Sequence, residues 1–133
     1  MDGCLFCAIA SGAIPCHKIY EDDTVCSFLD INPFSEGHAL VVPKRHFAGL
    51  LDTPEEELAA IVARVKRIAA HIKEALPCDG FNILQNNGAA AGQTVMHLHF
   101  HIVPRKEGGA TAFTPRAADP EALKALAERL RFA

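Results

Sequence analysis

The segment His97-Leu-His-Phe-His-Ile-Val103 decides the fold, because it alternates histidine with apolar residues. Successive side chains of a strand point to opposite faces, so the pattern predicts a strand with all its imidazoles on one face. Neighbouring imidazoles on such a face lie roughly 7 Å apart. Histidine favours neither strands nor apolar cores, and clustered imidazoles repel one another when protonated. Folding alone does not require this row, so we expect it to serve chemistry.

Two kinds of site can use a row of imidazoles. His-x-His on a strand is a common metal-binding arrangement, which keeps open a catalytic metal site formed by His97, His99 and His101. A catalytic face without metal needs partners, and the loop just upstream offers them with Gly92, Gln93 and Thr94. Backbone amides of such a loop can cradle an anion, and imidazole attacks phosphorus well when its other ring nitrogen is held by a hydrogen bond. Phosphoryl chemistry is therefore the leading interpretation.

The distribution of apolar residues along the rest of the chain predicts an α+β fold with an antiparallel sheet. Short apolar runs bounded by turns predict strands at 19–20, 25–28, 38–42, 81–85 and 98–103. Thr53 and Pro54 have the sequence of a helix start, and apolar residues then recur every three or four positions to about Leu76. A shorter C-terminal helix is expected over about 119–131. Hairpin-scale connections between most strands favour helices packed on one side of the sheet.

Composition limits the classes of function. The 133 residues suit one domain, 1–133, with a single core. Thirteen basic and sixteen acidic residues give a net charge of -3, without the basic block that binds nucleic acid. The chain has no apolar run of the roughly 18–20 residues needed to span a membrane. Five cysteines and the lack of a secretion signal indicate a reducing compartment, so we expect a cytoplasmic protein.

The stretch Gly92–Val103 resembles the signature of the histidine triad (HIT) family, in which three histidines alternate with apolar residues, and it is most similar to the Hint branch. The similarity continues over most of the chain, including Asp30-Ile-Asn-Pro33 and Pro43-Lys-Arg-His46. It implies a five-stranded antiparallel sheet with one long helix. It also implies a homodimer with a ten-stranded sheet and the long helix in its interface. The expected C-terminal helix departs from the best-known Hint proteins, which end in a short strand-like segment.

The resemblance implies a purine nucleotide hydrolase, either a nucleoside phosphoramidase or a dinucleoside polyphosphate hydrolase. His99 would attack the α-phosphorus to form a covalent nucleotidyl-histidine, which water then cleaves. His101 would contact the phosphate, His38 would help proton transfer, and the Thr94 hydroxyl would bond near the leaving group. The nucleotide-binding residues implied are Phe6, Ile9, Phe28 and Ile31 around the base, Asp30 at the ribose, and Asn86, Gln93, Thr94, His99 and His101 at the phosphate.

Cys4 and Cys7 form a Cys-x-x-Cys motif, which by itself suits a redox pair or half of a metal site. The resemblance to bacterial-type HIT proteins implies that this pair joins His46 and His97 in a zinc site. Four protein ligands leave no open position on zinc, so the site would be structural. A metal-free cysteine pair remains the alternative.

Two other functions stay open beside the hydrolase. One is a nucleotide-binding regulator with negligible turnover, and the other is the metalloenzyme with three histidine ligands. Activity that depends on His99 would exclude the regulator, whereas activity that survives a chelator would exclude the metalloenzyme. The sequence leaves the leaving group and the choice between adenine and guanine undetermined.

Overall fold

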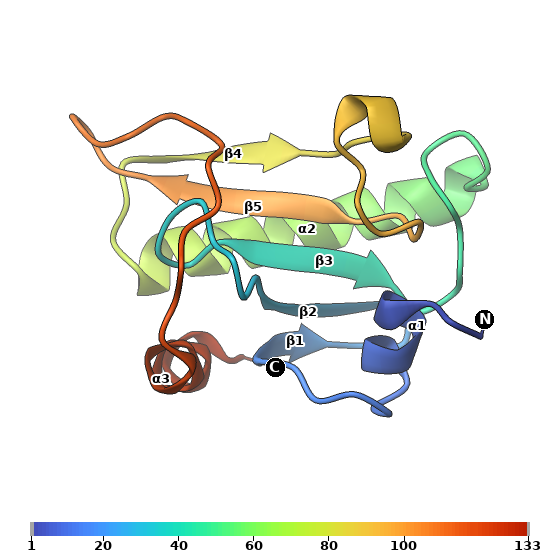
Figure 1. The fold of residues 1–133 in the computed structure, drawn as a ribbon, viewed down its shortest axis with the longest axis horizontal. Coiled ribbons are helices and arrows are strands. Elements are labelled where there is room, and N and C mark those ends of the chain that lie inside the picture. Colours follow the sequence, from blue (N-terminus) through green and yellow to red (C-terminus); the bar gives the residue numbers. More distant parts are fainter. Residues whose placement is uncertain (1, 133) are drawn as a thin grey trace.

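The computed structural model describes residues 2–132, which build one antiparallel sheet of five strands flanked by helices (Figure 1). The order across the sheet is β1-β2-β3-β5-β4, and every neighbouring pair is antiparallel. The strands are β1 Lys18–Glu21, β2 Val25–Leu29, β3 Ala39–Pro43, β4 Gly80–Leu84 and β5 Phe100–Arg105. The predicted α+β class and five-stranded sheet are confirmed.

The helices differ in which part of the sheet they cover. The long helix α2, Glu55–Ala75, lies behind the sheet in Figure 1, and α3, Pro120–Leu130, lies beside β1. The short helix α1, Leu5–Ala10, crosses the front of the sheet, and a 3-10 turn, Ala89–Ala91, stands in the loop between β4 and β5. No helix within residues 2–132 is long and apolar enough to cross a membrane.

Apolar side chains fill both sides of the central strands, which makes the sheet the middle layer. Along β2, Val25 and Leu29 join the large core beneath α2, whereas Cys26 and Phe28 join a smaller cluster that faces α1. All five residues of β2 are buried. The smaller cluster forms a firm apolar floor on the front of the sheet.

The long helix begins later than predicted. Its first residue is Glu55, with Pro54 at the N-cap, and Thr53 makes no capping hydrogen bond. The Thr53 hydroxyl instead donates to the Gly49 carbonyl, in the turn before the helix, at 2.7 Å. The C-terminal helix is where it was predicted, and the Asp119 side chain caps it by accepting from the Glu121 amide.

Strand β5 also begins later than predicted, at Phe100. The Leu98 amide donates to the Phe47 carbonyl at 2.7 Å, so this part of the chain bonds to a loop and not to the sheet. Apolar and histidine side chains still point to opposite faces, because Leu98, Phe100 and Ile102 all pack in the large core. The triad histidines therefore face the front of the sheet, as expected.

Helix α1 was not predicted from the sequence. The Cys4 sulfur accepts a hydrogen bond from the Cys7 amide at 3.4 Å and caps the helix. Phe6 and Ile9, three residues apart, are the residues that α1 buries against the sheet. With only six helical residues, the segment is too short for apolar periodicity to reveal it.

Candidate active site and metal site

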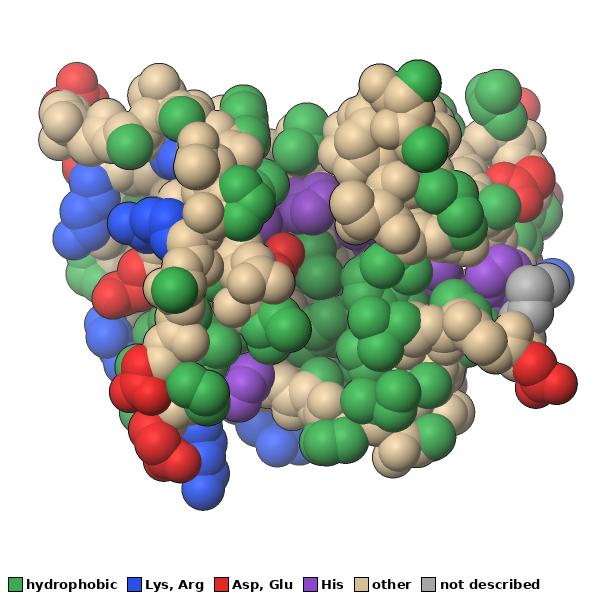
Figure 2. Space-filling model, viewed as in Figure 1, with side chains coloured by type: hydrophobic (Ala, Val, Ile, Leu, Met, Phe, Trp, Pro, Cys, Tyr) green, Lys and Arg blue, Asp and Glu red, His purple; other side chains and the backbone are tan. Residues whose placement is uncertain are grey.

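A cavity of about 480 Å³ opens on the front of the sheet beside α1. Figure 2 shows hydrophobic and histidine side chains gathered in this hollow. Eight of the predicted site residues line it: Phe6, Ile9, Phe28, Asp30, Ile31, Thr94, His99 and His101. The structure thus brings together residues from α1, β2, β5 and the loops that precede β3 and β5.

Aromatic rings line the apolar end of the cavity. The Phe6 ring meets Phe28 edge to face at 5.7 Å between centroids, and it meets the His99 ring at 5.0 Å. Ile31 stands at the rim with 64% of its surface exposed. Apolar walls around one polar end are typical of a small-molecule pocket, and this slot suits a planar aromatic base.

His99 is held as a neutral imidazole with one free nitrogen. Its Nδ1–H donates to the His97 carbonyl oxygen at 2.7 Å, and a carbonyl can only accept. The proton therefore sits on Nδ1, which leaves the Nε2 lone pair available. Burial lowers the pKa of His99 below its usual 6.5, so the ring stays unprotonated near neutral pH. These are the properties that a nucleophilic imidazole needs.

A chain of hydrogen bonds also fixes His38 and His101. The Phe34 amide donates to His38 Nδ1 at 2.9 Å, so the His38 proton lies on Nε2. Nε2 in turn donates to His101 Nδ1 at 2.9 Å, which leaves the His101 proton on Nε2. Burial lowers the pKa of His38 to about 4 and that of His101 to about 3. Both rings are neutral at pH 7, and His101 presents an N–H donor.

Phe34 is a site residue that the sequence did not reveal. Its amide orients His38, and its ring stacks over His101 at 6.0 Å with an 18° tilt between planes. Phe34 lies in the turn between Asp30 and His38, and nothing in the sequence of that turn indicates which amide meets the imidazole.

Asp30 serves both the cavity and the turn that follows it. One carboxylate oxygen accepts from the Asn32 amide at 2.8 Å, and the other lies 3.6 Å from His38 Nε2. The side chain is thereby held at the cavity wall beside the imidazole pair. A fixed carboxylate at that position can accept hydrogen bonds from hydroxyl groups of a ligand.

Polar residues of the loop before the triad have two roles. Some line the cavity, and others form hydrogen bonds that stabilise the loop itself. Thr94 lines the cavity, but Asn86 and Gln93 do not. The buried Gln93 carboxamide accepts from the Gly88 amide at 2.8 Å and donates to the carbonyls of Ala48 and Val95. Every polar atom of the Gln93 side chain is thus engaged in holding the loop.

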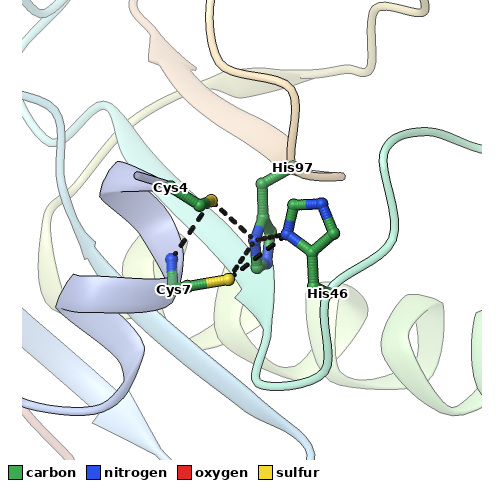
Figure 3. Close-up of side chains that lie close together, drawn as sticks. All are labelled: Cys4, Cys7, His46 and His97. Atoms are coloured by element: carbon green, nitrogen blue, oxygen red, sulfur yellow. Dashed lines mark hydrogen bonds between the residues drawn. The ribbon is translucent and has the colours of Figure 1, made fainter. Parts of the chain in front are cut away.

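A second cluster lies at the N-terminal end of α1, where the side chains of Cys4, Cys7, His46 and His97 converge (Figure 3). The Cys7 sulfur lies 3.2 Å from His46 Nδ1 and 3.4 Å from His97 Nδ1, and the two Nδ1 atoms are 3.2 Å apart. Bond lengths of about 2.3 Å to sulfur and 2.0 Å to nitrogen give edges of roughly 3.3–3.5 Å in tetrahedral zinc. The four side chains fit that geometry.

The His97 ring is oriented for this cluster and against a three-histidine metal site. His97 Nε2–H donates to the Pro43 carbonyl at 2.8 Å, so Nδ1 carries the lone pair that faces the cysteines. A hydrogen bond from the outer nitrogen is the usual support of a metal-bound imidazole. The geometry thus favours the cysteine cluster over one metal on His97, His99 and His101: His97 belongs to the other cluster, and His99 is in neither metal-compatible group among the described residues.

Comparison with known proteins identifies the family of this chain. A HIT domain model matches residues 11–108. The adenosine 5′-monophosphoramidase hnt1 of Schizosaccharomyces pombe is 41% identical over 130 residues, covering 96% of this chain and 95% of the relative. The adenylylsulfatase HINT3 of Arabidopsis thaliana is 50% identical over 104 residues, or 78% of this chain, which spans about half (53%) of that relative.

Solved structures show the same architecture. A Hit-like protein involved in cell-cycle regulation from Bartonella henselae superposes with a TM-score of 0.89 at 39% identity, covering 98% of this chain and 96% of that one. A zinc-bound histidine triad protein from Mycobacterium smegmatis has a TM-score of 0.83 at 46% identity, covering 96% and 95%. Domain match, sequence identity and shared fold agree: this chain belongs to the histidine triad family of HIT domain proteins.

Proposed function

We propose that this protein hydrolyses purine nucleotides at the α-phosphate through a covalent intermediate on His99. The observation that carries the proposal is the hydrogen bond from His99 Nδ1 to the His97 carbonyl, which frees Nε2 at the floor of an aromatic pocket. The names of two relatives, an adenosine 5′-monophosphoramidase and an adenylylsulfatase, support a nucleotide hydrolase.

The first step forms a bond between His99 Nε2 and the α-phosphorus and breaks the bond from phosphorus to the leaving group. The leaving group departs with a proton from a water molecule in the cavity, while His101 Nε2–H, oriented by the 2.9 Å hydrogen bond from His38, donates a hydrogen bond to the leaving atom. Water then attacks phosphorus and breaks the bond to His99. Its proton is taken up by the hydroxide left from the first step, and a nucleoside monophosphate is released.

In this proposal each part of the nucleotide meets different residues. The base lies in the slot formed by Phe6, Ile9, Phe28 and Ile31, and the ribose hydroxyls donate to Asp30. Thr94, which lines the cavity, contacts the phosphate, and Asn86 reaches it from the same loop although it does not line the cavity. Gln93 contributes by fixing the loop that carries both, since its own amide is engaged.

The Cys4, Cys7, His46 and His97 cluster holds a structural zinc ion in this proposal. The donor distances fit tetrahedral coordination, and a solved relative is zinc-bound. With four protein ligands the ion has no place for substrate, so it supplies stability to the N-terminal segment and takes no part in the chemistry. His97 is then unavailable as a proton carrier.

We further propose a homodimer in the cytoplasm, without nucleic acid or membrane partners. Strand β4 lies at one edge of the sheet, where Phe81 and Ile83 expose 40% and 45% of their surface. On α2, Val62 exposes 46%. Pairing of β4 with β4 of a second protomer extends the sheet to ten strands and covers these exposed apolar side chains.

One experiment tests the function. The purified protein is incubated with adenosine and guanosine 5′-phosphoramidates, dinucleoside polyphosphates and nucleotide sugars, and kcat/KM is measured for each, with and without a chelator. We expect turnover of a phosphoramidate or a polyphosphate that survives the chelator. No turnover despite AMP binding would support the regulator instead, and loss of activity while the protein stays folded would support a metalloenzyme.

A further inference from the structure

A segment without regular structure, residues 106–119, joins β5 to α3 and crosses the front of the sheet (Figure 1). Nearly all of its residues are exposed, so burial contributes little to fixing this crossing segment. Arg105, the last residue of β5, fixes it by hydrogen bonds: the guanidinium donates to the carbonyls of Ala110 and Ala112 at 3.1 and 2.8 Å. Its Nε donates to the Asn82 side chain on β4 at 2.9 Å. Arg105 is thus anchored on the sheet and holds the segment beside it.

The crossing segment meets the turn between β2 and β3 at two points. The Arg116 amide donates to the Pro33 carbonyl at 2.9 Å. The Phe113 ring meets the Phe34 ring edge to face at 5.7 Å between centroids, with 81° between the planes. The Arg105 guanidinium carbon lies 5.2 Å from the centroid of the Phe113 ring, within the range of a cation–π contact. Phe113, although 47% exposed, therefore contacts both an anchored side chain of the sheet and a side chain of the turn.

Phe34 carries these contacts to the imidazoles. Its ring lies 4.6 Å from the His38 ring and 6.0 Å from the His101 ring, and its amide donates to His38 Nδ1. We propose that Phe113 and Arg105 are positioning residues: by holding Phe34 in place, they orient the two imidazoles. The role rests on the proposed function, in which His101 Nε2–H donates to the leaving atom. Neither Phe113 nor Arg105 lines the cavity, so both act through Phe34 and not on the substrate.

Phe113→Leu removes the ring edge that holds Phe34 and keeps an apolar side chain. Phe34 then gains room to move, and the direction of the His101 Nε2–H donor becomes less defined. We expect kcat to fall roughly 2- to 10-fold, the factor that the loss of one aromatic pair can supply. KM should stay near the wild-type value, because the proposed base and ribose contacts come from other residues. Phe113→Tyr keeps the ring and should keep the wild-type kcat.

Phe132→Leu is the matched control. Phe132 follows α3 and is also partly exposed, and its ring packs against the rings of Tyr20 and His71, away from the cavity. This variant should lower the melting temperature at least as much as Phe113→Leu while kcat stays at the wild-type value. An equal fall of kcat in the two variants would mean general loosening of the fold and would overturn the proposal.

Arg105→Lys tests whether Arg105 and Phe113 act together. Lysine keeps the positive charge but lacks the planar fork with which the guanidinium serves its three acceptors. Alone it should lower kcat about as much as Phe113→Leu. The double variant should be no slower than the slower single variant, because both changes free the same ring. Effects that multiply would show that the two residues act independently, against the proposal.

The decisive measurement does not depend on turnover. Long-range ¹H–¹⁵N spectra of the full chain report the tautomer of His38 and of His101 and the exchange of their ring protons with water. The wild type should show both rings protonated on Nε2. In Phe113→Leu the His38 Nε2 proton should exchange at least about twofold faster, whereas Phe132→Leu should match the wild type. Unchanged exchange in Phe113→Leu would overturn the proposal. Faster exchange in a protein whose wild type turns over no nucleotide would support the positioning role and contradict only the proposed function.

Discussion

His38 Nε2 lies 2.9 Å from His101 Nδ1, inside a region where both rings are at least nine-tenths buried. His38→Ala leaves that acceptor unsatisfied, which should lower the free energy of unfolding by about 1–3 kcal/mol. Loss of the hydrogen bond that orients the His101 Nε2–H donor should lower kcat by roughly 10²-fold. Steady-state kinetics and denaturant unfolding measure the two effects.

The control for this change is His38→Gln, whose amide nitrogen can occupy the Nε2 position and donate to His101. It should recover most of the lost stability and most of kcat, because the amide supplies the hydrogen bond that orients His101. A wild-type kcat in His38→Ala would show that the pair plays no part in catalysis.

The pH dependence of kcat/KM should reveal the buried nucleophile. An ordinary histidine is half protonated near pH 6.5. Burial lowers the pKa of His99, so the neutral, reactive ring should persist as the pH falls through 6.5, and kcat/KM should decline only at lower pH. Half-loss of activity at or above pH 6.5 would contradict the assignment.

The same lowered pKa values predict a loss of stability in acid. The unfolded chain takes up protons on its histidines below pH 6.5, whereas folded His38 and His101 do so only near pH 4 and 3. The free energy of unfolding should therefore fall with falling pH between these limits, by up to about 1.4 kcal/mol per pH unit for each histidine. Thermal melts across this range test the slope, which should be shallower in His101→Asn. An equal slope in that variant would refute the buried neutral state of His101.

Asp30→Ala should weaken binding of ribonucleotides more than that of 2′-deoxy analogues. A carboxylate that accepts hydroxyl hydrogen bonds contributes roughly 1.5–3 kcal/mol, and a sugar lacking the 2′-hydroxyl gains less from it. KM or Kd for matched ribo and deoxy substrates gives the comparison. Equal losses would mean that Asp30 acts mainly through its bond to the Asn32 amide, which caps the turn.

The protein should carry about one zinc per chain, since its four donors form a single closed site. A Cys4→Ser, Cys7→Ser double variant should bind none and melt at a lower temperature. Because Phe6 and Ile9 extend from the same helix into the pocket, its KM should rise while kcat is largely kept. Cys78→Ser is the control and should keep its zinc. Absence of stoichiometric metal in protein made in zinc-replete medium would rule out the site.

The sequence predicted the parts of this molecule that depend on local repetition. Alternation placed His97, His99 and His101 on one face, and apolar spacing found both α2 and α3. It did not predict helix α1, whose capping depends on a cysteine sulfur in a segment too short to show periodicity.

Local sequence patterns do not predict contacts between segments that are distant in the sequence. Neither the bond from Phe34 to His38 nor the orientation of His97 toward two cysteines follows from spacing. The sequence also predicted the wrong hydrogen-bond partner for a side chain that has several possible partners. The Thr53 hydroxyl bonds to Gly49 in place of the helix, because its choice depends on the path of the preceding turn.

The kcat of His99→Ala, measured with an adenosine 5′-phosphoramidate beside the wild type, tests the central claim most directly. If His99 Nε2 is the nucleophile, kcat should fall by at least about 10³-fold, equivalent to roughly 4 kcal/mol, while AMP affinity and melting temperature change little. Retention of more than about one tenth of the wild-type kcat, a loss of under about 1.4 kcal/mol, would contradict the covalent mechanism.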